Sequence, residues 1–88
     1  MRANQNFILK EIAGEFILLP TGNMAAKFAG IIDLNESGVL LWNRLRSDCS
    51  EQELIDVLLD EYDIDEQTAE QDVRIFLARM READLLID

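Results

Sequence analysis

The side chains of this 88-residue chain that could do covalent or metal chemistry are few and poorly placed for it. The single cysteine, Cys49, has no histidine anywhere in the sequence to act as its base, and it lacks the partners that a disulfide or a zinc site requires. The acidic segment DEYDIDEQ (60–67) resembles a calcium loop, but the glycine that the sharp turn of such a loop needs is absent. We therefore expect no metal and no cofactor.

Two further patterns that could support catalysis also fail. The carboxylates at 60–63 could do acid–base work, but they lie in a polar stretch between two predicted helices, where nothing raises a pKa. Gly22, Gly30 and Gly38 are too far apart to form a phosphate-binding loop. The sequence thus predicts no catalytic residue and no enzyme, and the function of the chain must come from binding.

The net charge of −10 is concentrated in the second half of the chain. Residues 1–47 carry five basic and four acidic residues, whereas residues 48–88 carry three basic and fourteen acidic ones. This balance argues against nucleic acid as a partner, because binding to phosphates depends on lysine and arginine. The acidic run is either a solvated helix surface or a surface that attracts a basic partner. No apolar run is long enough to span a membrane and no signal segment is recognisable, so we expect a cytoplasmic protein with no membrane partner.

The first third of the chain has the alternation and the turn residues of a β-sheet. The segments FILKEI (7–12) and EFILLP (15–20) flank Ala13-Gly14, which predicts a hairpin with a two-residue turn. A third strand is expected at 30–34, GIIDL.

Three helices follow, and each has a recognisable start. Asn35 is a good N-cap, Ser50 and Glu53 form a capping box, and Asp65 caps the last helix. We expect the helices at 35–47, 50–61 and 65–83. The apolar segment LLI at the end could add a short final strand. The predicted architecture is a single α+β domain over 1–88, winged-helix-like, with a three-stranded antiparallel sheet followed by three helices (β-β-β-α-α-α).

Two surfaces of such a fold could bind a partner. An edge strand presents a row of unpaired N–H and C=O groups, to which an extended peptide can add as a further strand. On the last helix, Ile75 falls on the side opposite the buried stripe centred on Val73. Ile75 is either an isolated exposed apolar residue or, with Ala78 and Arg79, part of the wall of a peptide groove.

Taken in order along the chain, four segments resemble the PqqD family, and together they cover essentially the whole sequence. They are EIAGEFILLPTG, GIIDLNESGVLLWNRL, SEQELIDVLLDEYDID and DVRIFLARMREADLL. The most specific part is LNESG (34–38) followed by Leu41-Trp42. Many relatives end the last helix with a glycine. This chain has Ala83-Asp84 at that place, which makes the left-handed conformation that usually ends a helix less favourable.

The resemblance implies a peptide chaperone built on the recognition element of ribosomally made, post-translationally modified peptides. Such a protein binds the leader of a precursor peptide and presents the core to a modifying enzyme, often a radical SAM protein. In the family the leader adds to the third strand, in a cleft whose other wall is the third helix. Mapped onto this sequence, the peptide-binding residues are Gly30, Ile31, Ile32, Asp33, Asp72, Ile75, Phe76 and Arg79.

Other functions remain open for the same elements. The helical half suits a winged-helix transcription regulator, although its acidic charge counts against one, and the chain could also be a purely structural subunit of an enzyme complex. An exposed strand edge allows a homodimer. The final product is either pyrroloquinoline quinone or another modified peptide, and we favour the second.

Gly38 lies in the first turn of a predicted helix, where a glycine is unexpected. Because it has no Cβ, it could let this helix pack tightly beneath the third strand and hold the strand rigid for a ligand, with Trp42 as the core anchor. Alternatively, it relieves a crowded helix–sheet contact and has no link to a ligand.

Overall fold

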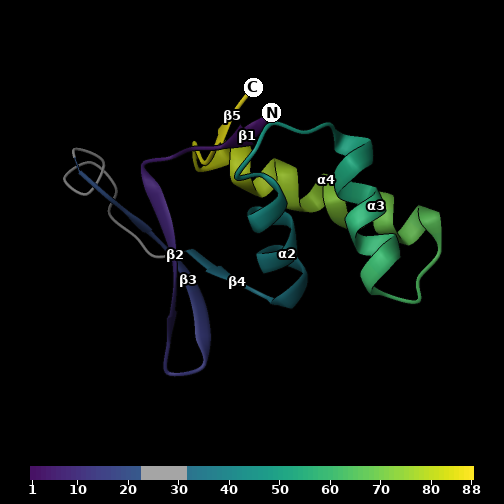
Figure 1. Cartoon of the computed structure of the whole chain (residues 1–88), viewed down its shortest axis with the longest axis horizontal. Helices are drawn as coiled ribbons and strands as arrows, with labels where there is room; N and C mark the ends of the chain where they lie inside the picture. Colours follow the sequence, from purple (N-terminus) through teal and green to yellow (C-terminus); the bar gives the residue numbers. More distant parts are fainter. Residues whose placement is uncertain (23–31) are drawn as a thin grey trace.

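A computed structural model of the chain describes residues 1–22 and 32–88 (Figure 1). The main sheet is antiparallel with the strand order β2–β3–β4, where β2 is Phe7–Ile12, β3 is Glu15–Pro20 and β4 is Ile32–Leu34. Three helices follow, α2 (Glu36–Arg44), α3 (Glu51–Glu61) and α4 (Glu66–Glu82). This order confirms the predicted α+β fold. The third strand is expected to start at Gly30, but Gly30 and Ile31 lie outside the described residues.

The β2–β3 hairpin turns at Ala13 and Gly14, as the sequence predicts, and it extends away from the helices (Figure 1). Both turn residues have positive φ, 53° at Ala13 and 81° at Gly14, as a type I′ turn requires. Such a turn matches the right-handed twist of the strands and sets the register, with Ile12 opposite Glu15. The left-handed conformation is easy for glycine but strained for alanine.

A second, two-stranded sheet joins the first and last described segments. In it β1 (Arg2–Ala3) pairs antiparallel with β5 (Leu86–Ile87), and Figure 1 shows the two ends side by side. The sequence predicts the final strand but not its partner, because two residues carry no periodic pattern. The Ala3 amide also donates to the Leu45 carbonyl (2.7 Å), which ties this segment to the end of α2. That helix stops at Arg44, before the predicted end at 47.

Each helix begins one residue after the cap that the sequence identifies. The Asn35 side chain accepts a hydrogen bond from the Gly38 amide (2.8 Å), and the Asp65 side chain accepts one from the Thr68 amide (2.8 Å). The capping box at Ser50 is complete in both directions. Because these caps satisfy amides that have no partner within the helix, they fix where the helices start.

The end of α4 has the hydrogen bonds of a Schellman motif although it has no glycine. Asp84 takes the left-handed conformation with a φ of 63°. Its amide donates to the Arg81 carbonyl (3.1 Å), and the Leu85 amide donates to the Met80 carbonyl (2.8 Å). Leu85 and Met80 are both fully buried, as the apolar pair of this motif usually is. Asp84 therefore takes the left-handed position that glycine usually occupies in this motif, with some conformational strain.

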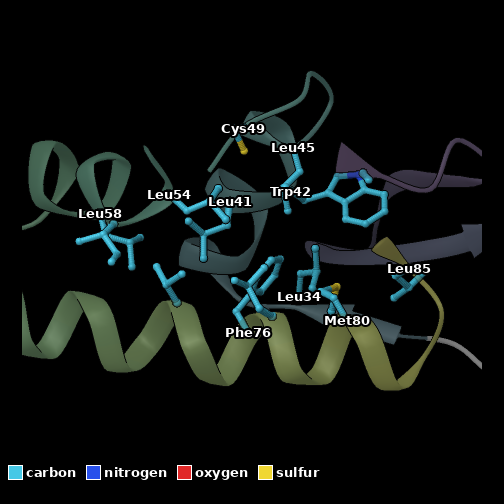
Figure 2. Close-up of a cluster of buried hydrophobic side chains, with 14 of the residues drawn as sticks. Leu34, Leu41, Trp42, Leu45, Cys49, Leu54, Leu58, Phe76, Met80 and Leu85 are labelled. Atoms are coloured by element: carbon cyan, nitrogen blue, oxygen red, sulfur yellow. The ribbon is translucent and has the colours of Figure 1, made fainter. Parts of the chain in front are cut away.

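The hydrophobic core lies among the helices and the inner face of the sheet. Figure 2 shows side chains of α2, α3 and β4 gathered over α4, which contributes Phe76 and Met80. Trp42 is buried in this cluster, as expected of a core anchor, together with Leu34 from β4. The core therefore positions β4 and α4 within one packed unit.

Gly38 allows α2 to lie close to the end of β4. A methyl group at this position would lie 3.1 Å from the cap oxygen of Asn35 and 3.4 Å from two carbons of Leu34. The contact with the Asn35 oxygen is tighter than most carbon contacts, and the contact with Leu34 is an ordinary van der Waals distance, so a side chain at this position would press on the cap at the end of the strand. The close packing that the sequence analysis assigns to this glycine is thus present.

Candidate functional site

Among the described strands none pairs with the outer edge of β4, and this open edge exposes the main chain of Asp33. In a two-residue hairpin the residues that flank the turn form a hydrogen-bonded pair, and bonded and non-bonded pairs alternate along the ladder. Ile12 and Glu15 are that pair, so the main chain of Ile17 faces β2 and turns away from β4. Asp33 lies opposite Ile17. Its N–H and C=O therefore point away from β3, toward the open edge.

Arg79 of α4 reaches this edge from the other side. Its Nη2 donates a hydrogen bond to the main-chain carbonyl of Asp33 (3.0 Å) and lies 3.5 Å from the Oδ1 of the same residue. A carbonyl that accepts a hydrogen bond from α4 is not paired with β3, which agrees with the direction that the hydrogen-bond alternation of the sheet predicts. The side chains of Arg79 and Asp33 are 52% and 81% exposed, so the contact is open to solvent.

A hollow of about 200 Å³ lies beside this contact, between the end of β4, the start of α2 and α4. Its lining includes Asp72, Ile75, Phe76 and Arg79, four of the residues that the sequence analysis assigns to a peptide cleft. Ile75 is 62% exposed, whereas Phe76 is only 9% exposed and belongs to the core (Figure 2). Ile75 thus offers free apolar surface, and Phe76 supplies a rigid base beneath it.

The remaining predicted strand residues are placed differently. Ile32 is half-buried and packs against the core, and its main chain faces β3 because it alternates with Asp33. It therefore cannot offer main-chain groups to a ligand at the open edge. Gly30 and Ile31 lie outside the described residues. Within the described part of β4, the open edge is thus formed by Asp33.

Sequence reasoning missed the contribution of α2 to this site. Ser37, Gly38 and Leu41 of α2 line the hollow, next to the Asn35 cap and to Leu34 at the end of β4. The available signal was that the Asn35 cap follows the strand without a loop, which brings the first turn of α2 beside the strand end.

A second hollow of about 320 Å³ continues from the first. The two share Asn35, Ser37 and Asp72, and the second adds Glu36, Leu58, Tyr62 and Ile64. Burial raises the pKa of Tyr62, and the nearby Glu36 carboxylate raises it further. The Tyr62 phenol thus stays neutral beside the carboxylates of Glu36 and Glu61. The combined groove has an apolar base and an acidic border formed by Glu36 and Asp72.

In the described part of the sheet, β2 forms the other open edge, and a larger hollow of about 500 Å³ lies against it. Its lining comes from β2, the segment before it and α2, and shares no residue with the groove beside α4. By the same alternation, Leu9 and Glu11 direct their main chains outward there. Ile8, 40% exposed, adds apolar surface. This edge is the alternative docking position, and it lacks a helix wall with an exposed apolar residue such as Ile75.

The described residues include the side chains that the sequence suggests for metal or covalent chemistry. No group of three or more His, Cys, Asp or Glu among them is arranged to hold a metal ion. Cys49 is buried, and burial raises the pKa of its thiol, which keeps it protonated and unreactive. In the same part of the chain, none of the helices has the length and apolarity needed to cross a membrane.

Comparison with solved structures identifies relatives of this fold. Two solved structures match, one described as TbiB1 in complex with the TbiA(beta) leader peptide and one as lasso peptide synthetase B1 complexed with the leader peptide. The first is 24% identical and covers 100% of both chains with a TM-score of 0.76. The second is 20% identical and covers 99% of this chain and 96% of that chain with a TM-score of 0.75. These likenesses establish the fold.

Sequence comparison gives the family. A search of the curated proteins finds no match. The model of the family described as coenzyme PQQ synthesis protein D (PqqD) matches residues 15–86, which include β3, β4 and all three helices. Because this match spans most of the chain, the protein belongs to the PqqD family.

Proposed function

We propose that this protein binds the leader of a ribosomally made precursor peptide as a strand on the open edge of β4 and presents the precursor to a modifying enzyme. The observation that carries the proposal is the main chain of Asp33, which points outward beside a hollow with Ile75 exposed in it. The two similar structures, each a complex with a leader peptide, support it.

Main-chain pairing alone does not supply enough affinity. Each added hydrogen bond nets about 0.5–1.5 kcal/mol, whereas micromolar binding needs about 8 kcal/mol. Apolar leader side chains must therefore enter the hollow, where Ile75 and the base formed by Phe76 receive them. Asp72 and Arg79 line the same hollow with opposite charges, so a leader residue of either sign has a partner there.

The partner that receives the bound precursor is proposed to be a radical SAM protein or another peptide-modifying enzyme, and the product is a modified peptide other than pyrroloquinoline quinone. We place the protein in the cytoplasm, as a single domain without enzymatic activity, metal or cofactor of its own. The second open edge, at β2, would allow a homodimer.

A transcription regulator is disfavoured by the ion pairs of α4. This helix has three arginines, and each lies beside a carboxylate: Arg74 at Glu70 (2.6 Å), Arg79 at Asp33 (3.5 Å) and Arg81 at Asp88 (3.4 Å). A recognition helix needs cations that are free to meet phosphates. A gel-shift assay at low salt tests this alternative, and we expect no shifted DNA band.

The direct test is an amide-shift titration of the ¹⁵N-labelled protein with the leader of the precursor peptide encoded nearest its gene. We expect saturable shifts in the micromolar range at 32–34 and 72–79. An unchanged spectrum with every neighbouring leader would overturn the chaperone function of the isolated protein.

A further inference from the structure

The Arg79 contact falls on the main-chain group that strand addition requires. Asp33 is the described residue of β4 whose N–H and C=O face the open edge, and its carbonyl already accepts a hydrogen bond from Arg79 (3.0 Å). An added strand needs that carbonyl as the acceptor for one of its own amides. In the unbound protein, the edge is therefore partly closed by a side chain of the opposite wall.

This contact is suited to opening. Both side chains are more than half exposed, and an ion pair in such a position contributes little net stability because water competes for both partners. The same Nη2 meets the carbonyl and the carboxylate of Asp33, so both interactions are lost together when the guanidinium turns away. A ligand that offers Arg79 an equivalent acceptor would replace both.

We propose that Arg79 is a latch on β4 that selects leaders with an acidic side chain. The leader strand takes over the Asp33 carbonyl, and the leader carboxylate takes over the guanidinium that this displaces. A leader with a neutral residue at that position must open the latch without replacing the ion pair. The proposal rests on the function proposed above and specifies which leaders that site accepts.

Arg79 is the charge at the latch with which a leader carboxylate can pair. Arg79 is the basic residue among those that line the hollow, and Asp72 is the acidic one. When Arg79 turns away it loses both of its acceptors on Asp33, and a leader carboxylate would give the guanidinium an ionised acceptor in their place.

The test compares Arg79→Gln with the unmodified protein, using synthetic copies of the leader encoded beside the gene. Each residue of the leader is replaced in turn by Glu and, in a matched copy, by Gln, and affinities are measured by calorimetry. We expect one position at which Glu binds the unmodified protein about fivefold more tightly than Gln. Arg79→Gln should abolish this preference and should bind the Gln copy at least twofold more tightly than the unmodified protein does. The second effect is specific to a latch, because a simple attraction between Arg79 and the leader would not produce it.

The matched control is Arg74→Gln on the same helix, because Arg74 pairs with Glu70 and Glu51. This variant should keep the preference for Glu over Gln and should bind the Gln copy as the unmodified protein does. If the Gln copy binds Arg79→Gln no more tightly than it binds the unmodified protein, the latch is refuted while leader binding stands. If no copy binds the unmodified protein although its spectrum is that of a folded chain, the proposed function fails and the latch with it.

Discussion

Replacing Ile75 by Gln should weaken leader binding by about five- to thirtyfold. Full burial of an isoleucine is worth about 1.5–3 kcal/mol. Ile75 is 62% exposed, so covering this exposed part with a leader side chain contributes roughly 1–2 kcal/mol to the binding free energy. Glutamine keeps a similar length and adds no charge. Glutamate would be a poorer choice, because it would attract Arg79 one turn along α4 and disturb the contact with Asp33.

The assay is calorimetric titration of the leader together with thermal unfolding of each variant. Most of the Ile75 side chain is exposed to solvent in the unbound protein, so Ile75→Gln should change the free energy of unfolding by no more than about 0.5 kcal/mol. The matched control is Ile8→Gln on β2, which is 40% exposed beside the other open edge. That variant should bind the leader with unchanged affinity.

Either of two results would refute this reasoning. Unchanged affinity in Ile75→Gln would remove the hollow beside α4 from the binding site. A loss in Ile8→Gln with none in Ile75→Gln would move the leader to the edge of β2. Because both variants replace an exposed isoleucine by glutamine, the difference between their affinities shows where the leader binds. It does not reflect a general effect of reducing the apolar surface.

Three further predictions concern stability. Ala13→Asn should raise the free energy of unfolding by about 0.5–1 kcal/mol, because asparagine tolerates positive φ at the first position of a type I′ turn better than alanine does; thermal unfolding measures it, and a lower midpoint would contradict the turn assignment. Asp84→Gly should stabilise the end of α4 by about 0.5–1 kcal/mol in the same assay, unless the left-handed conformation at 84 is wrong. Hydrogen bonding with the Thr68 side chain and with the Thr68 amide lowers the pKa of the Asp65 carboxyl below its ordinary 3.8, so the stability that these bonds contribute is complete above that value and is lost as pH falls below it. Asp65→Asn keeps a cap that cannot titrate, so its melting temperature should fall less than that of the unmodified protein as pH drops from 5 toward 2; parallel curves would contradict this.

The features that the sequence predicts well are those that depend on local chemistry. The hairpin turn at Ala13-Gly14 and the caps at Asn35, Ser50 and Asp65 are each set by a few adjacent residues, and all are present in the structure. The exposure of Ile75 follows from helical periodicity in the same way, because its angle from the buried stripe depends only on sequence spacing.

The features that the sequence misses depend on residues far apart in the chain. The pairing of β1 with β5 has no pattern of its own, since each strand has two residues. The contact between Arg79 and Asp33 joins positions 46 residues apart and depends on how α4 packs beneath β4. The type I′ turn reveals which groups of β4 face outward only once the register of all three strands is known. These facts belong to tertiary packing, which periodicity and caps do not encode.

The most direct test of leader addition to β4 is the hydrogen exchange rate of the Asp33 amide with and without the leader. In the unbound protein this N–H points to an open edge, and in the complex it donates to the leader main chain, so its exchange should slow at least tenfold at saturation. The amides of Leu9 and Glu11, which face the open edge of β2, should keep their rates. Protection at Leu9 and Glu11 with an unchanged rate at Asp33 would contradict the account and place the leader on β2.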